Sequence, residues 1–155
     1  MEARPRRTGL LQWLYVWLLR VLLLRDVEGD VEMGYVMYCI VNRDALKQMN
    51  GNRGKLAAQA GHAYLHSYLD AYNRFTIDAV KYMTEGKAKK VCLVVDSVED
   101  LDKIQRAYID KCGASMVVDA GVTIFKGVPT TTCLGVGPIH SDIIGEDLKA
   151  LKVLI

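Results

Sequence analysis

The sequence has no short motif for covalent or metal-dependent hydrolysis. There is no Gly-x-Ser-x-Gly turn, which excludes the exposed serine nucleophile that many esterases use. No Cys-x-x-Cys pair occurs, and His62 and His66 lack both the intervening glutamate of His-Glu-x-x-His and a third ligand. We therefore expect no cofactor and no metal ion. Any ester or amide hydrolysis by this chain should use water directly and be insensitive to EDTA.

A strong excess of one charge is also absent. The chain has 20 Lys and Arg residues and 18 Asp and Glu residues, which gives a net charge of +2. Any nucleic-acid contact must therefore be local rather than spread over the whole surface. The candidates for phosphate contacts are Arg43, Arg53 and Lys55, which lie around the first predicted strand and the start of the helix that follows, where free backbone N–H groups attract anions.

The four cysteines have no metal-binding spacing. Cys39, Cys92, Cys112 and Cys133 fall in predicted strands or a predicted helix, so we expect small, buried, unpaired side chains. Free cysteines are the default in a reducing compartment. The chain has 155 residues, of which 51% are hydrophobic, and this is enough for one domain to bury a core without disulfides.

Strand-like and helix-like segments alternate from residue 35 onward. Residues 50–54, rich in asparagine and glycine, predict a loop. We expect strands at 35–42, 90–96, 116–119 and 132–137, a strand-like end at 151–155, and helices at 55–72, 76–84, 98–112 and about 142–147. This alternation predicts a single domain with a three-layer α/β/α fold and a mixed sheet of four to five strands.

The helix expected from residue 55 carries a polar stripe. Lys55, Gln59, His62 and His66 are spaced i, i+4, i+7 and i+11, so they share one side of the helix. The alanines and glycine between them, within residues 57–63, should let the other sides approach the sheet closely. A solvated helix face would show the same spacing, so the stripe alone does not distinguish a site from a surface.

A second polar group follows the strand expected at residues 116–119. Asp119 ends that strand, and Ala120-Gly121 turns the chain at once. A carboxylate held at the end of a rigid strand is a common functional position. An aspartate that only hydrogen-bonds the amides of its own turn would leave the same pattern. Thr123, two residues beyond the glycine, is open to the same two interpretations.

Five ordered sequence blocks together resemble one known family, the type-2 peptidyl-tRNA hydrolases. They are R-D, G-K-x-A-A-Q-x-x-H-A, D-A-G-x-T, T-x-L-G-x-G-P and L-K-x-L, at residues 43–44, 54–63, 119–123, 132–138 and 151–154. The resemblance extends over residues 35–155. It implies a cytoplasmic, homodimeric enzyme that hydrolyses the ester bond between a peptide and tRNA and so releases free tRNA for translation.

The resemblance also implies which residues form the active site. The family's proposed catalytic residues fall on Lys55, Asp119, Thr123 and Thr132, with Gln59 and His62 beside them on the helix. Substrate contacts are expected from Arg43, Arg53 and Gln59.

Three departures stand against the family pattern. The segment between Asp44 and Lys55 is several residues longer than usual, and Val122 stands where the family often has arginine. The turn before Pro138 is one residue longer, so Thr130, Thr131 and Thr132 are hard to tell apart, although counting back from residues 134–138 favours Thr132.

Direct attack by water requires a group that positions or deprotonates the water and donors for the developing oxyanion. In our hypothesis Asp119 orients or deprotonates the water, Lys55 and Thr123 stabilise the oxyanion or an adjacent phosphate, and Thr132 forms one wall. His62 is the alternative base. Two rival functions remain: a non-catalytic RNA-binding or interaction module, and a small-molecule esterase or amidase.

Residues 1–34 lie outside the resemblance to the family. They contain an apolar run at residues 9–24 that is shorter than the roughly 20 residues of a membrane span, is interrupted by Arg20, and has no small-residue cleavage site after it. The run is a membrane anchor or targeting segment, an amphipathic surface helix, or upstream translation before a true start at Met33 or Met37. We favour the last interpretation because the hydrolase-like domain begins immediately afterwards.

Overall fold

The computed structural model describes residues 34–85 and 88–155, and all structural statements below refer to these residues. The apolar run at residues 9–24 lies outside them, and so do the three interpretations of that run. Of the helices in the described part, none combines the length and apolar composition that crossing a membrane requires.

Five strands form one mixed sheet in the order β3-β4-β1-β2-β5. β1 (Tyr35–Asn42) and β2 (Lys89–Val95) are parallel neighbours in the middle of the sheet. β4 (Thr130–His140) runs antiparallel to β1, and β3 (Ala114–Asp119) runs antiparallel to β4 at one edge. The two-residue β5 (Lys152–Val153) pairs with β2 at the other edge.

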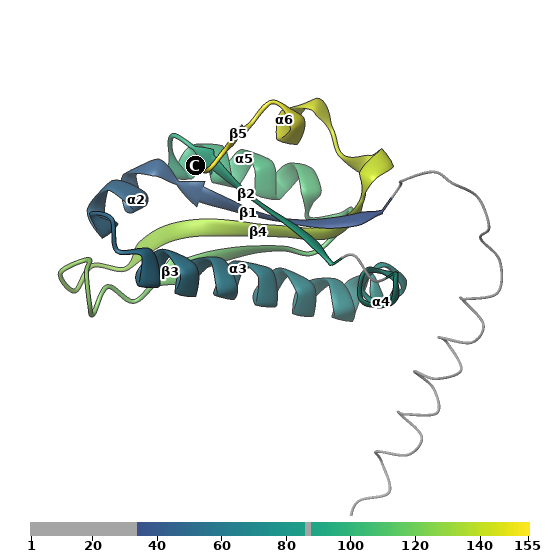
Figure 1. Cartoon of the computed structure of the whole chain (residues 1–155), viewed down its shortest axis with the longest axis horizontal. Helices are drawn as coiled ribbons and strands as arrows, with labels where there is room; N and C mark the ends of the chain where they lie inside the picture. The colour runs from purple at the N-terminus through teal and green to yellow at the C-terminus, as the bar shows by residue number, and fades with distance from the viewer. Residues whose placement is uncertain (1–33, 86–87) are drawn as a thin grey trace, which may run out of the picture. The chain divides into compact units, whose positions relative to one another are not determined.

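Helices cover both faces of this sheet (Figure 1). α3 (Arg53–Arg74) and α4 (Thr76–Thr84) lie on one face, and α5 (Val98–Tyr108) and α6 (Glu146–Lys149) lie on the other. α2 (Arg43–Met49) follows β1 directly, and a short 3₁₀ turn (Ser141–Ile143) precedes α6. The described residues therefore form a single α/β domain with five α-helices and a five-stranded sheet, which confirms the predicted three-layer fold.

The sequence predicted no helix or strand between the strand at 35–42 and the loop at 50–54, but α2 occupies this segment. The Asn42 side chain caps α2 by accepting a hydrogen bond from the Asp44 backbone, and Asn50 ends the helix in the left-handed conformation, with φ 47°. Ala45 and Met49 bury its inner side against Phe125. A seven-residue helix has only one such i, i+4 apolar pair, which is too little periodicity to detect in a sequence.

The expected packing of α3 also needs correction. Its buried positions are Gln59, Ala63, Ser67 and Ala71, one row spaced by four residues, whereas Ala57, Ala58 and Gly61 are exposed. The close approach to the sheet occurs at Gly135 of β4, where an added Cβ would lie 2.0 Å from the Ala63 carbonyl oxygen. The absent side chain of Gly135 therefore allows α3 to lie directly on β4 and brings Gln59 towards the sheet.

Candidate active site

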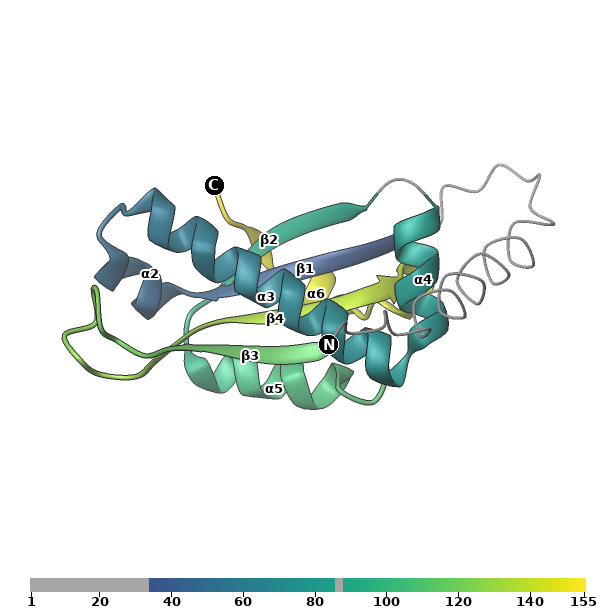
Figure 2. The same cartoon turned by 90° about the horizontal axis from the view of Figure 1, so that it is seen from below.

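The beginning of α3 is held at the end of the sheet where β3 terminates (Figure 2). Asn52 caps the helix: its side-chain oxygen accepts a hydrogen bond from the Lys55 backbone N–H at 2.9 Å. One helical turn separates Lys55 from Gln59, so the two side chains project on the same side of α3. Both reach Asp119, the last residue of β3.

Asp119 is surrounded by hydrogen-bond donors. Its Oδ1 accepts a hydrogen bond from the Gly121 backbone N–H at 2.8 Å, which closes the turn after β3. Its Oδ2 accepts one from Gln59 Nε2 at 2.9 Å and forms an ion pair with the Lys55 ammonium. Side-chain exposure is 16% for Lys55 and 10% for Asp119, so little water screens the pair.

This environment keeps Asp119 ionised. The hydrogen bond from Lys55 is the main cause that lowers the pKa of the Asp119 carboxyl, and burial opposes it. The Gly121 N–H, the charge of Lys55 and the Gln59 amide lower this pKa further. An aspartate with a depressed pKa is a weak base near neutral pH, so the geometry suits an acceptor that orients its neighbours better than one that removes a proton.

Lys55 links the carboxylate to the loop between β3 and β4. Its Nζ donates to the Thr123 hydroxyl at 3.1 Å and lies 5.8 Å from the centre of the Phe125 ring. Phe125 is buried against α2, which anchors this loop. Gly121 adopts φ +84°, and a Cβ there would lie 2.4 Å from the Val128 carbonyl oxygen, so this turn requires glycine.

Thr132 contacts the network from its buried side, through Gln59. Its side chain is fully buried, and its hydroxyl donates to Gln59 Oε1 at 2.7 Å. Because Oε1 is engaged in this way, the Gln59 amide presents its NH₂ group to Asp119. Thr130, by contrast, donates to the Val128 carbonyl in the loop. Of the three neighbouring threonines, Thr132 is therefore the one whose side chain joins the network.

Three further site candidates lie outside this network. His62 is exposed on α3, with its ring centre 5.6 Å from that of His66. Arg53 is exposed at the first position of α3. Arg43 Nε is 2.8 Å from Asp96 Oδ1, in an ion pair between α2 and the end of β2. Within the described residues, none of the three hydrogen-bonds to Asp119 or Lys55.

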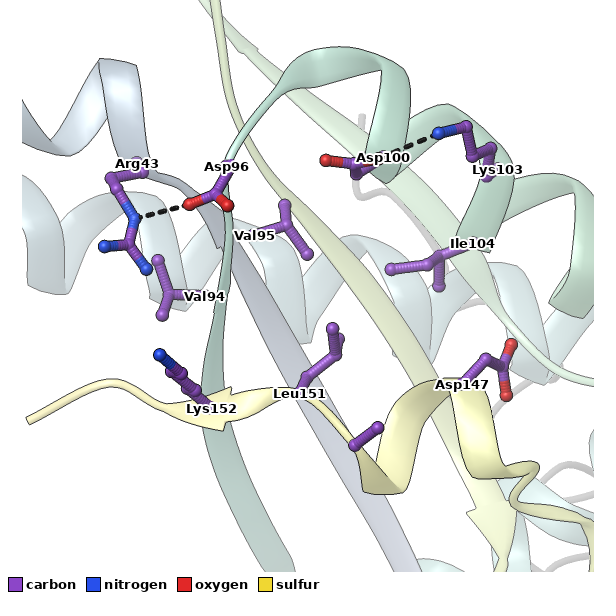
Figure 3. Close-up of a pocket in the computed structure, with 11 residues that line it drawn as sticks. Arg43, Val94, Val95, Asp96, Asp100, Lys103, Ile104, Asp147, Leu151 and Lys152 are labelled. Atoms are coloured by element: carbon purple, nitrogen blue, oxygen red, sulfur yellow. Dashed lines mark hydrogen bonds and ion pairs between the residues drawn. The ribbon is translucent and has the colours of Figure 1, made fainter.

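Arg43 instead borders a pocket of about 430 Å³ on the α5 side of the sheet (Figure 3). Apolar residues of β2, α5 and the C-terminal segment form its floor, and charged residues form its rim. Asp96 and Asp100 are each paired with a cation, Arg43 and Lys103 respectively. The pocket shares no lining residue with the Lys55–Asp119 network.

Sequence reasoning missed the contribution of Phe125 and the link between Gln59 and Thr132. The available signal for Phe125 was weak: it is the one aromatic residue in residues 120–130, which also contain Val122, Ile124 and Val128. Nothing in the sequence pairs residue 59 with residue 132, because that contact depends on how α3 lies across β4. The four cysteines are free, with Cys92 the least buried. In residues 34–85 and 88–155 no three His, Cys, Asp or Glu side chains are grouped as metal ligands.

Comparison with known proteins yields one consistent family. The family model described as peptidyl-tRNA hydrolase PTH2 matches residues 35–154. A protein of Methanococcus vannielii named peptidyl-tRNA hydrolase is 41% identical over 117 residues, covering 74% of this chain and 96% of the relative. A protein of the same name from Methanothermobacter thermautotrophicus is 38% identical over 118 residues, with 74% and 96% coverage. The matched segment begins at the first residue of β1 and contains the whole polar network.

Proposed function

The chain belongs to the peptidyl-tRNA hydrolase PTH2 family, and we propose that it cleaves its substrate at the network formed by Lys55, Gln59, Asp119 and Thr123. It is an ester hydrolase that acts on peptidyl-tRNA. The observation that supports this location is the Lys55 ammonium, held between the Asp119 carboxylate and the exposed Thr123 hydroxyl at the rim of the domain.

In the proposed mechanism, a water molecule attacks the ester carbonyl without a covalent enzyme intermediate. Lys55 and the Thr123 hydroxyl donate hydrogen bonds to the oxyanion that forms on the carbonyl oxygen. Asp119 accepts a hydrogen bond from the attacking water and holds Lys55 in place. As the carbon–oxygen bond to the ribose breaks, one proton of the attacking water passes to the ribose oxygen. The new carboxylic acid releases its remaining proton to solvent, and the peptide carboxylate and the free tRNA leave.

We assign Gln59 and Thr132 positioning roles. The buried Thr132 hydroxyl fixes the Gln59 amide, and that amide fixes one oxygen of Asp119. His62 remains the alternative base because it lies one helical turn beyond Gln59 on the exposed side of α3. His62→Asn distinguishes the two: a rate within threefold of wild type supports Asp119 as the group that handles water, and a loss of roughly 10²-fold assigns the base to His62.

The tRNA is proposed to approach over the beginning of α3. Arg53 is exposed there, and the free N–H groups of the first turn attract phosphate. Arg43 is a second candidate, although a phosphate would have to displace Asp96 from it. The Arg43 and Asp96 side chains are largely exposed, so their ion pair is worth at most about 1 kcal/mol and a phosphate could replace Asp96 at little cost.

Release of labelled peptide from peptidyl-tRNA, with an ester lacking any nucleotide as control, separates the three functions. Selective release from peptidyl-tRNA supports the hydrolase. Hydrolysis of both esters at similar rates supports a small-molecule esterase. Binding of tRNA without release supports the non-catalytic RNA-binding module.

We also propose a homodimer in the cytoplasm. Leu65, Leu69 and Tyr72 are exposed on α3 at i, i+4 and i+7, an apolar stripe that suits a helix contact with a second copy. Light scattering after gel filtration tests this, and replacement of Leu65 and Leu69 by serine should give monomers. A tRNA substrate and four free cysteines favour the cytoplasm. Fractionation of the full chain against a chain beginning at Met33 tests whether residues 9–24 hold it at a membrane.

A further inference from the structure

Shortly before Asp119, the outer edge of β3 has backbone groups without hydrogen-bond partners at two of the described residues, Met116 and Val118. β3 is the outermost strand of the sheet on this side (Figure 2). At its first residue the outward backbone groups are satisfied by side chains: Asp70 Oδ2 accepts from the Ala114 N–H at 3.0 Å, and Gln105 Nε2 donates to the Ala114 carbonyl at 3.2 Å. These two contacts show which backbone groups of β3 face outward.

Alternate residues of a strand direct their N–H and C=O groups to the same side. Since Ala114 points outward, so do Met116 and Val118. The register shift between Val117 and Val118 places its extra residue, Thr132, in β4 and therefore leaves the alternation along β3 intact. Within the described residues, no side chain or loop hydrogen-bonds to the outward groups of Met116 and Val118. Val118 as a whole residue is 57% exposed. A short stretch of edge is therefore available to another extended chain.

This edge also lacks the usual protection against strand addition. Edge strands commonly carry lysine, proline or other devices that discourage pairing, but residues 115–118 are Ser-Met-Val-Val. At the opposite edge, Lys152 lies in β5, and Lys89 and Lys90 occupy the part of β2 that β5 does not cover. The unprotected edge is the one that leads to the proposed active site.

We propose that the peptide part of the substrate binds as an added strand along the Met116–Val118 edge of β3; this rests on the proposed function. The ester is the C-terminal end of the peptide and must lie near Asp119, at the carboxyl end of β3. The peptide therefore runs parallel to β3. Main-chain pairing of this kind does not depend on the side chains of the peptide. This independence suits an enzyme that releases peptides of varied sequence.

The polarity determines the hydrogen bonds. In a parallel ladder, one residue of the added strand donates its N–H to residue i−1 of its neighbour and accepts from the N–H of residue i+1. With the esterified residue level with Asp119, the third residue from the ester lies opposite Val117. Its N–H donates to the Met116 carbonyl and its carbonyl accepts from the Val118 N–H. The Val118 carbonyl accepts the N–H of the esterified residue. The amide N–H of the second residue points away from the edge.

Substrates with single N-methyl groups test this register on the unmodified full-length chain. The series is a tripeptidyl-tRNA whose N-terminus is acetylated, so that the nitrogen of the third residue is an amide, the same substrate N-methylated at the third residue, and the same substrate N-methylated at the second residue as the matched control. Loss of a hydrogen bond with added crowding should raise KM about tenfold for the third-residue substrate. The second-residue substrate should stay within twofold. Equal KM values for all three substrates would overturn the proposal.

A proline variant tests the same register from the protein side. Val118→Pro removes the N–H that faces the carbonyl of the third residue, and this N–H faces away from β4, so no bond between β3 and β4 is lost. Val118→Pro should raise KM several-fold for the tripeptidyl substrate but not for an N-acetyl-aminoacyl-tRNA, which has no third residue. An equal change for both substrates contradicts the assigned register, and if Val118→Pro does not fold, the N-methyl series decides.

A shorter substrate separates the proposed peptide docking at β3 from the proposed hydrolase function. An N-acetyl-aminoacyl-tRNA has no third residue, so the hydrolase should cleave it with a KM about tenfold above that of the tripeptidyl-tRNA. Cleavage of both with the same KM overturns the β3 docking site and leaves the hydrolase assignment intact. No cleavage of either substrate overturns the proposed function, and the docking site with it.

Discussion

Two ion pairs at the ends of strands each join a basic side chain to an aspartate but differ in their surroundings. Lys55 and Asp119 have side-chain exposures of 16% and 10%, whereas Arg43 and Asp96 have 43% and 81%. Asp119 also accepts hydrogen bonds from a backbone N–H and from Gln59. Exclusion of water strengthens the first pair and leaves the second weak. A basic and an acidic residue therefore become a candidate catalytic device only where the fold encloses them.

The largest expected effect follows replacement of the enclosed carboxylate. Asp119→Asn retains the size but removes the charge, and it turns an NH₂ group or a neutral oxygen towards Lys55 and Gln59. We expect kcat/KM for peptidyl-tRNA to fall by roughly 10²-fold or more. Asp96→Asn is the matched control and should stay within threefold. A rate for Asp119→Asn within threefold of wild type would remove Asp119 from the mechanism.

The second prediction contrasts the enclosed Lys55 with Arg53, which is exposed at the beginning of the same helix. Lys55→Met keeps the aliphatic stem and removes the oxyanion donor, so kcat should fall about 10- to 10²-fold. Arg53→Met should mainly raise KM and flatten its dependence on salt, because a phosphate contact is lost. Steady-state kinetics across a salt series measures both. Unchanged kinetics in both variants would refute the proposed tRNA approach over α3.

The third prediction concerns the acid side of the pH profile. The pKa of Asp119 lies below its ordinary value, so the carboxylate loses its charge only as pH falls through that lowered pKa. The acid limb of the pH profile of kcat/KM should therefore lie at a pH below the ordinary aspartate pKa of about 3.9. Lys55→Met removes the main cause of the shift, so its acid limb should move to higher pH, while that of Arg53→Met should not. Coincident acid limbs in all three proteins would contradict this assignment.

The smallest effect on rate is expected at the buried end of the network. Thr132→Val leaves Gln59 Oε1 without its donor, which should cost about 1–3 kcal/mol of unfolding free energy and lower kcat several-fold by loosening the Gln59 amide. Thr130→Val, which removes a hydroxyl bonded to the loop carbonyl of Val128, is the control and should leave kcat unchanged. Denaturant unfolding and single-turnover rates measure the two effects. A loss of stability with unchanged kcat would make Thr132 purely structural.

Local sequence patterns predicted most elements but few contacts between them. The bounds of β1 and α4 agree with the prediction, because each is a continuous run with clear ends. α2 was missed because its stability comes from Ala45 and Met49 packing on Phe125, some eighty residues further along the chain. His62 and Gln59 belonged to one predicted stripe, yet the first is exposed and the second is buried. Helical spacing restricts residues to one side of a helix, but the sheet selects which part of that side is covered.

The sequence by itself determined the alternation of strands and helices, the turn at Gly121 and the residue types of the candidate site, because propensity, turn chemistry and charge are local properties of the chain. The tertiary structure decided which of those residues meet. Only the crossing of α3 over β4 at Gly135 places Gln59 between Thr132 and Asp119, and only the order of the strands leaves the β3 edge open beside that carboxylate. Contacts between residues sixty or more positions apart depend on how whole elements pack, and no local pattern contains that information.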